Sequence, residues 1–386
     1  MALQRSDTFD EFDEILEEAM QAQSPKGKLP RQASPPPSVQ PSSGPPAMSE
    51  VEYASEEVEE DDLFPHEFYG LKVSRTFDSS RGKLEAYSFE SIKEATQNFN
   101  ERLILGQGGF GKVYKGFLPY QDAWQEVAVK VMDFVEGVDQ SCSFDTEIRI
   151  LEGVSHPHVV KLLGFCSEPH KVLVYEFVEM GSLENILAKS KRASGSGDAV
   201  SWITRVRIAY EAALALEYLH SIEPEPILHR DFKPGNILLD KHCKVKLADV
   251  GLSRIAPELA QSGTGAVSYI QDTTIMGSLG YIDPMYLSSG KFRPASDVYS
   301  FGITLLQLVT GASRPQGLVD DVDAAVESKA LHQIADKTAG AWPKVVLDEM
   351  VKLALQCIER RPKERPSLEK DIVPILSIMT QHCPEI

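Results

Sequence analysis

The chain of 386 residues is poor in cysteine and has no excess of positive charge. Its five cysteines are scattered, without the spacing of a metal site or a disulfide framework, and they fit a reducing compartment. A net charge of −18 argues against direct nucleic-acid binding, because such binding relies on lysine and arginine to neutralise phosphates. No apolar run approaches the length that spans a membrane. Charged residues follow Met1 closely and residue 2 is alanine, so neither a secretory signal nor N-myristoylation is expected.

The first part of the chain differs in composition from the rest. Residues 1–82 contain 17 acidic and 7 basic residues, 24–47 are rich in proline, serine and glutamine, and 50–62 are largely acidic. Such segments cannot bury enough apolar surface to offset chain entropy, so we expect residues 1–86 to be a disordered tail. The acidic run is either a solvated segment or a docking site for a basic partner. Apolar residues at helical spacing over 8–20 predict a short helix, which either folds on a partner or remains transient.

One short segment, residues 229–236, carries three side chains suited to phosphate chemistry. Asp231 can accept a proton from a hydroxyl group, and Lys233 can balance the charge of a phosphate. Asn236, together with Asp249 in the sequence Asp-Val-Gly, offers the oxygen ligands that Mg²⁺ prefers. The spacing therefore predicts a loop that handles a phosphoryl group.

A glycine-rich stretch over residues 106–113 precedes the strand-like sequence Val-Ala-Val that ends at Lys130. A lone glycine motif is weak evidence, because dinucleotide-binding folds use it too. Here the β-branched residues around it alternate, which predicts that the stretch lies in a β-hairpin. In a dinucleotide-binding site it would stand at the start of a helix. Glu147 follows in a segment with helical apolar spacing. Alone, such a lysine or glutamate is usually a solvated surface residue; the presence of several such motifs in one order argues for a functional role.

These motifs, in this order, resemble those of eukaryotic protein kinases. Flanking sequences at 87–99, 156–164 and 280–302 are similar to those of plant receptor-like cytoplasmic kinases of the receptor-like kinase/Pelle group. The resemblance covers residues 87–380. It implies an α+β, bilobal kinase fold, with a small antiparallel β lobe and one key helix at about 99–178 and a larger, mainly helical lobe at about 179–380.

The resemblance also implies an ATP-dependent serine/threonine protein kinase that uses Mg²⁺. Asp231, Lys233, Lys130 and Glu147 are then the expected catalytic residues, and Asn236 and Asp249 the expected metal ligands. Tyr175 matches the gatekeeper at the back of the nucleotide pocket. The expected ATP-binding residues are Gly106, Gln107, Gly108, Gly109, Phe110, Gly111, Val113, Ala128, Lys130, Tyr175, Glu176, Phe177 and Val178.

Protein substrates are the expected partners, and a membrane receptor kinase or another signalling protein could hold this otherwise cytoplasmic chain at the plasma membrane. Asp297 matches an aspartate that braces the catalytic loop. Arg230 beside the catalytic aspartate suggests control by phosphorylation, for which Thr273 and Thr274 are the candidates.

Two residues depart from the family pattern. Val250 replaces a phenylalanine, which could loosen the packing around the metal-binding aspartate. Met285 replaces a glutamate that pairs with a buried arginine, here Arg365. We therefore expect Arg365 to lack its partner and the large lobe to be less stable. The alternative function is a weakly active or inactive pseudokinase scaffold that binds partners through its fold and its acidic tail; the intact phosphate-handling residues argue against it.

Overall fold

The computed structural model describes residues 84–108, 111–121, 123–132, 140–192, 199–222, 226–250, 254–255, 269–271 and 275–381. The expected tail up to residue 83, with its helix at 8–20, lies outside these ranges, as do Gly109, Phe110, Thr273 and Thr274. Within the described part, no helix is long and apolar enough to cross a membrane.

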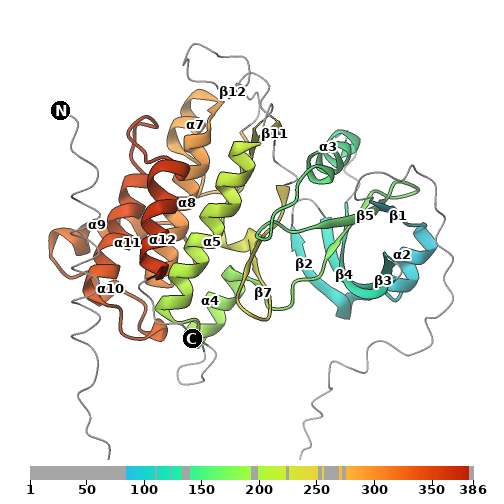
Figure 1. The fold of residues 1–386 in the computed structure, drawn as a ribbon, viewed down its shortest axis with the longest axis horizontal. Coiled ribbons are helices and arrows are strands. Elements are labelled where there is room, and N and C mark those ends of the chain that lie inside the picture. Colours follow the sequence, from blue (N-terminus) through green and yellow to red (C-terminus); the bar gives the residue numbers. More distant parts are fainter. Residues whose placement is uncertain are drawn as a thin grey trace, which may run out of the picture. The chain divides into compact units, whose positions relative to one another are not determined.

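The smaller lobe is built on a six-stranded sheet with the order β1-β5-β6-β4-β3-β2 (Figure 1). Only the β1–β5 pair is parallel. The strands are β1 (Glu85–Ala86), β2 (Ile104–Gly108), β3 (Gly111–Tyr120), β4 (Ala123–Val131), β5 (Leu162–Cys166) and β6 (Val172–Glu176). The helices of this lobe are α2 (Phe89–Ala95), the 3₁₀ turn η2 (Glu101–Leu103) and α3 (Gln140–Glu152). Regular structure thus begins two residues before the expected boundary at 87, because β1 joins the sheet edge beside β5.

The glycine-rich stretch forms the β2–β3 hairpin, as its alternating pattern predicted. Alternate residues of β3 and β4 are buried, and Val127 and Val129 are fully enclosed. Gly111 begins β3 with φ of +126°, and a Cβ atom there would lie 1.9 Å from the Val131 carbonyl oxygen. Only glycine can therefore bring β3 this close to β4.

The larger lobe is mainly helical. Its helices are α4 (Leu183–Arg192), α5 (Trp202–Ser221), α7 (Pro284–Ser289), α8 (Pro294–Thr310), α9 (Leu318–Glu327), α10 (Leu331–Ile334), α11 (Lys344–Cys357) and α12 (Val373–Gln381), with the short turns η3 (Pro234–Asn236), η5 (Lys337–Ala339) and η6 (Leu368–Ile372). Helix α8 is buried along most of its length and packs between α5 and α11, while α12 packs on α5. Figure 1 shows these helices gathered on one side of the described chain and the six-stranded sheet on the other, which confirms the expected bilobal α+β fold.

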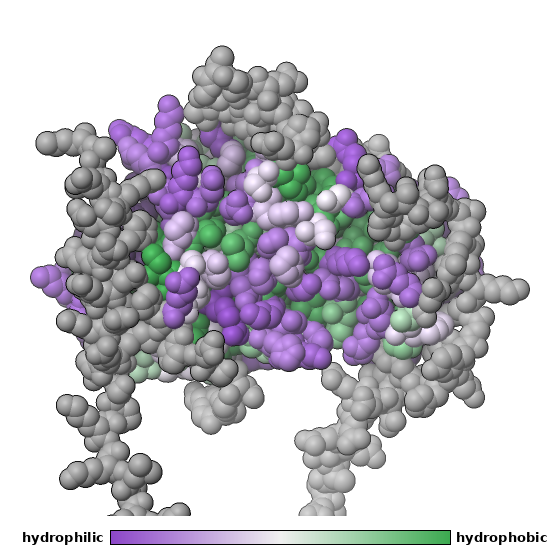
Figure 2. Space-filling model, viewed as in Figure 1, coloured by the Kyte–Doolittle hydropathy of each residue, from purple (hydrophilic) through white to green (hydrophobic). Residues whose placement is uncertain are grey.

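Short strands in this lobe position the functional loops. They are β7 (Gly181–Ser182), β8 (Ile227–Leu228), β9 (Ile237–Leu239), β10 (Val245–Leu247), β11 (Arg254–Ile255), β12 (Ile270–Gln271) and β13 (Lys291–Phe292). The antiparallel pair β9–β10 begins directly after Asn236 and ends two residues before Asp249, so the hairpin brings these two residues to the same end. In the space-filling view, hydrophilic residues cover much of the described face and apolar areas are smaller (Figure 2).

Candidate active site

Four side chains, from β4, β6, α3 and the segment after β10, meet in one cluster. Lys130 at the end of β4 donates to both carboxylate oxygens of Glu147 on α3, each at 3.2 Å. The same ammonium group donates to Asp249 Oδ1 at 2.9 Å. The hydroxyl of Tyr175 on β6 donates to Glu147 Oε1. The structure therefore brings the expected lysine–glutamate pair together and adds the tyrosine as a second donor to the glutamate.

These contacts set the charge states of the cluster. Burial alone would lower the pKa of the Lys130 ammonium, but the carboxylates of Asp249 and Glu147 outweigh it and hold the pKa above its usual value. Burial would likewise raise the pKa of Asp249, and Lys130 reverses the shift. Burial and the neighbouring Glu147 carboxylate raise the pKa of Tyr175, so its hydroxyl keeps its proton and remains a donor.

The loop of residues 229–236 places a carboxylate with one free oxygen. Lys233 Nζ donates to Asp231 Oδ2 at 2.7 Å and to Ser278 Oγ at 2.6 Å. Asn236 Nδ2 donates to the Asp231 carbonyl oxygen at 2.8 Å and to Oδ2 at 3.2 Å. Asp231 Oδ1 is buried and has no hydrogen-bond partner in the described structure. A buried carboxylate oxygen without a donor is costly, so this atom is a natural acceptor for a hydroxyl from outside the chain.

Asp297 on α8 fixes the backbone of the loop of residues 229–236 by hydrogen bonds. Its two oxygens accept the backbone N–H groups of His229 and Arg230, each at 2.9 Å. His220 Nε2 lies 2.8 Å from Asp297 Oδ2. Burial would raise the pKa of Asp297, but the hydrogen bond and charge of His220 and the loop donors lower it. The aspartate therefore stays ionised in the core, and its expected bracing role is confirmed.

Oxygen ligands and open backbone in this region suit a nucleotide with a divalent metal ion. The amide nitrogen of Asn236 is directed at Asp231, which leaves its oxygen and the carboxylate of Asp249 as hard ligands. Cβ atoms built on Gly106 and Gly108 would meet no atom within 4 Å, so a phosphate can approach this backbone. The residues present thus fit the expected cofactors.

Comparisons with known proteins agree with this geometry. A family model described as protein tyrosine and serine/threonine kinase matches residues 99–375. The chain belongs to the protein kinase family. Membership of this family implies the use of ATP and a divalent metal ion.

Two kinds of plant relative are similar to this kinase domain. "Probable serine/threonine-protein kinase PBL16" of Arabidopsis thaliana is 38% identical over 77% of this chain and 73% of its own length. "U-box domain-containing protein 34" of the same plant is 39% identical over 76% of this chain but only 35% of its own length. "U-box domain-containing protein 70" of Oryza sativa subsp. japonica is 40% identical over 74% of this chain and 34% of its own length. The chain thus spans about a third of the U-box relatives, and the resemblance to receptor-like cytoplasmic kinases is confirmed.

The remaining expected nucleotide-binding residues of the kinase lie on neighbouring strands. The sheet register sets Val113 opposite Lys130 and Ala128 opposite Tyr175. Glu176 to Val178 continue from β6. The Glu176 carboxylate accepts from Lys246 Nζ at 2.8 Å, and Lys115 Nζ lies 4.7 Å from the centre of the Phe177 ring. These contacts fix the segment that links the two lobes.

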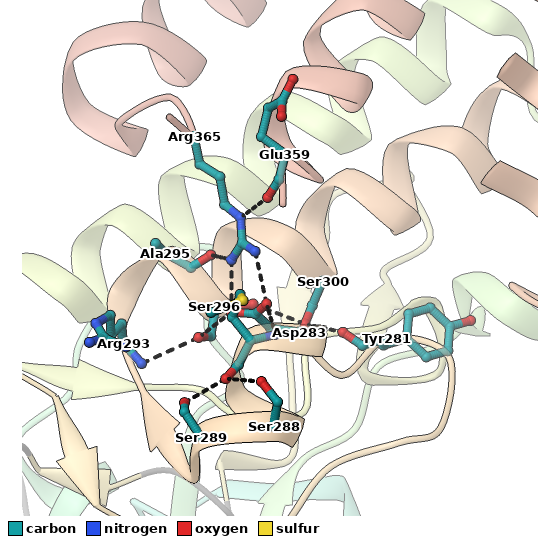
Figure 3. Close-up of polar contacts among 11 residues, drawn as sticks. Tyr281, Asp283, Ser288, Ser289, Arg293, Ala295, Ser296, Ser300, Glu359 and Arg365 are labelled. Atoms are coloured by element: carbon teal, nitrogen blue, oxygen red, sulfur yellow. Dashed lines mark hydrogen bonds and ion pairs between the residues drawn. The ribbon is translucent and has the colours of Figure 1, made fainter. Parts of the chain in front are cut away.

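The expectation for Arg365 was wrong. Asp283 accepts from both terminal nitrogens of Arg365, with Nη1 to Oδ2 and Nη2 to Oδ1 each at 2.8 Å (Figure 3). Arg365 also donates to the carbonyl oxygens of Ala295 and Glu359, at 2.7 and 2.8 Å. Met285 is 36% exposed and is not needed as a partner. Asp283 takes the place of the expected glutamate because α7 begins close enough to the arginine for this short side chain to reach it.

Two residues near the site have roles that the sequence alone did not assign. Asp283 caps α7 by accepting from Met285 N, a role that its place before Pro284 could have indicated. The hydroxyl of Tyr286 accepts from Met276 N at 3.1 Å and from Arg230 Nη2 at 3.3 Å. These two contacts of Tyr286 depend on packing and leave no pattern in the sequence.

Val250 is only 1% exposed and belongs to the main hydrophobic core, directly after Asp249. Valine therefore fills a buried position here while the aspartate keeps its bond to Lys130. The effect of the missing aromatic ring on activity stays a prediction.

Proposed function

We propose that this chain is an active, Mg²⁺- and ATP-dependent serine/threonine kinase that phosphorylates protein hydroxyl groups. The observation that carries the proposal is the free, buried Oδ1 of Asp231 beside Lys233 and Ser278. A serine or threonine hydroxyl is the donor that this oxygen lacks. Bound Mg²⁺–ATP would supply the phosphoryl group and neutralise part of its charge, held by Asn236 and Asp249.

Each residue of the site then has a distinct task. Asp231 orients the substrate hydroxyl and accepts its proton at Oδ1. Lys233 already spans Asp231 and Ser278, so its ammonium is positioned to balance charge beside the hydroxyl. Lys130 binds the α- and β-phosphates, and Glu147 fixes its direction. Positioning and charge stabilisation are the main sources of acceleration in this chemistry.

The alternative, a pseudokinase scaffold, draws on Val250 and Met285. Val250 packs in the core, and Asp283 pairs with Arg365 in place of the glutamate that Met285 replaces. Neither change therefore removes a phosphate-handling group. The assembled Lys130–Glu147 pair favours the active enzyme. We also propose that the kinase acts in cytoplasmic signalling, with a membrane receptor kinase or another signalling protein as the upstream partner. The sequence motifs that resemble those of plant receptor-like cytoplasmic kinases support this proposal.

A phosphotransfer assay tests the proposal. The purified chain of 386 residues is incubated with radiolabelled ATP, Mg²⁺ and a general serine/threonine substrate, alongside the Asp231→Asn variant. We expect incorporation by the parent and a loss of most of it in the variant, with thermal unfolding showing that both are folded. Equal incorporation by the two proteins would refute the role of Asp231, and none by the parent would favour the scaffold.

A further inference from the structure

A cavity of about 390 Å³ opens on the large lobe, apart from the phosphate-handling loop. It lies where the end of α5, the start of α8 and the start of η6 meet. None of its lining residues also lines the smaller pocket that contains Asp231, and none has a task in the proposed phosphotransfer. Sites for ligands usually measure roughly 300–1,000 Å³, so this cavity is large enough to take up a few side chains of a partner.

The wall that η6 contributes has a rare helical geometry. The amide group of Ile372 donates to the carbonyl oxygen of Ser367, five residues earlier, at 3.0 Å, which makes η6 a π turn. Such turns are rare and occur frequently at functional sites. Leu368 and Glu369, which line the cavity, both belong to this turn. The fold therefore keeps an uncommon backbone geometry at the edge of the cavity.

Part of the lining is apolar. Val298 on α8 and Leu368 on η6 are only 4% and 6% exposed and belong to the main hydrophobic core. The rings of Pro294 and Pro366 are half-buried and line the same cavity. An apolar side chain that enters here would leave water and contact these four residues, which favours its binding.

The charged groups that the cavity offers to a ligand are acidic. Among the described residues, no partner forms a hydrogen bond or an ion pair with the carboxylate of Glu217 on α5 or of Glu369 on η6. The side chain of Arg365 is fully buried and bound to Asp283. His220 directs Nε2 at the aspartate that fixes the catalytic loop, 2.8 Å away. The lining therefore has two free carboxylates and no free guanidinium or ammonium group to balance them.

We propose that this cavity docks a segment of a partner protein in which an arginine or lysine stands close to a leucine or a similar apolar residue. The apolar side chain packs against Val298 and Leu368. The cation pairs with Glu217 or Glu369. An acidic segment would meet two carboxylates of its own sign, which disfavours it. The net charge of −18 also favours the approach of cationic segments.

This inference does not depend on the proposed function, because docking at the cavity needs no phosphotransfer. The test measures the fluorescence anisotropy of short labelled peptides mixed with the chain of 386 residues. Each peptide has one arginine and one leucine, one to four positions apart, in a background of asparagine and glycine without hydroxyl side chains. We expect at least one spacing to bind about tenfold more tightly than the same peptide with glutamate in place of arginine, or asparagine in place of leucine. The preference over glutamate should shrink at high salt, because exposed charges are screened.

Variants of the two carboxylates assign the effect. The double variant Glu217→Gln/Glu369→Gln should weaken binding of the best peptide about fivefold to tenfold, the scale of two partly exposed charge pairs, and Glu369→Lys should weaken it as well. Asp323→Asn/Glu327→Gln removes the same two charges from exposed residues of α9 and should keep the parental affinity. Thermal unfolding shows that each variant is folded. Affinity that survives in the Glu217→Gln/Glu369→Gln variant, or that no peptide shows with the parent, overturns the proposal.

Hydrogen exchange followed by mass spectrometry locates the bound peptide without any variant. We expect slower exchange in residues 367–372 and 217–221, which line or adjoin the cavity. Slower exchange confined to residues 229–236, where a substrate would bind, overturns the docking site. Light scattering tests a second copy of the chain as the occupant: a dimer that Glu369→Lys dissociates would refute docking of a partner segment.

Discussion

Replacement of Asp283 by asparagine should destabilise the large lobe strongly. The Asp283 carboxylate is 1% exposed and accepts four hydrogen bonds, two of them from Arg365, whose side chain is fully buried. Asparagine keeps an acceptor for the α7 cap but leaves the arginine charge without a counter-ion. Removing one partner of a buried pair costs about 3–5 kcal/mol, and we expect the free energy of unfolding to fall by that amount.

The matched variant is Met285→Glu, which restores the glutamate found in the family. Each of the three guanidinium nitrogens of Arg365 already donates a hydrogen bond, to Asp283, Ala295 or Glu359, and Met285 is partly exposed. A new carboxylate at 285 therefore gains no buried partner, and the free energy of unfolding should change by less than about 0.5 kcal/mol.

Urea unfolding at 25 °C, followed by tryptophan fluorescence, measures both variants against the parent. A double-mutant cycle with Arg365→Leu then isolates the pair, because coupled residues give non-additive changes. The reasoning is refuted if the costs of Asp283→Asn and Arg365→Leu simply add. It is also refuted if Met285→Glu stabilises the chain by more than about 1 kcal/mol and that gain disappears in the Arg365→Leu background.

Four further outcomes are expected. Lys130→Ala should abolish most phosphotransfer, measured with radiolabelled ATP, while circular dichroism shows a folded protein. Tyr175→Phe should lower the free energy of unfolding by about 1.5–3 kcal/mol in urea, because a buried carboxylate loses a donor; no change would argue against the bond. Autophosphorylation should appear at Thr273 or Thr274 by mass spectrometry, and unchanged activity in the double alanine variant would exclude a switch there. Burial would raise the pKa of the Asp283 carboxyl group, but the hydrogen bonds and charge of Arg365 lower it overall. The ionised carboxylate therefore stabilises the fold fully above about pH 4, and this stabilisation is lost as the pH falls through the lower pKa of the folded state. The difference in free energy of unfolding between the parent and Asp283→Asn, measured in urea, should narrow on acidification.

Local spacing allowed most of the phosphate-handling residues to be found before the fold was known. Asp231, Lys233 and Asn236 lie within six residues, so one loop conformation brings them together. The alternation of β-branched residues around the glycine-rich stretch likewise predicted the hairpin, because side chains of a strand alternate between faces. Such features depend on backbone geometry over a few residues, which the sequence specifies directly.

Partners far apart in the chain were decided only by tertiary packing. The family pattern predicted residue 285 as the position that faces Arg365. The acceptor is instead Asp283, 82 residues before the arginine, because the start of α7 lies close enough to Arg365 for a short carboxylate to reach it. The free oxygen of Asp231 also arises from how separate elements pack. A difference of one or two ångströms selects among such acceptors, and residue spacing alone does not determine distances between elements on that scale.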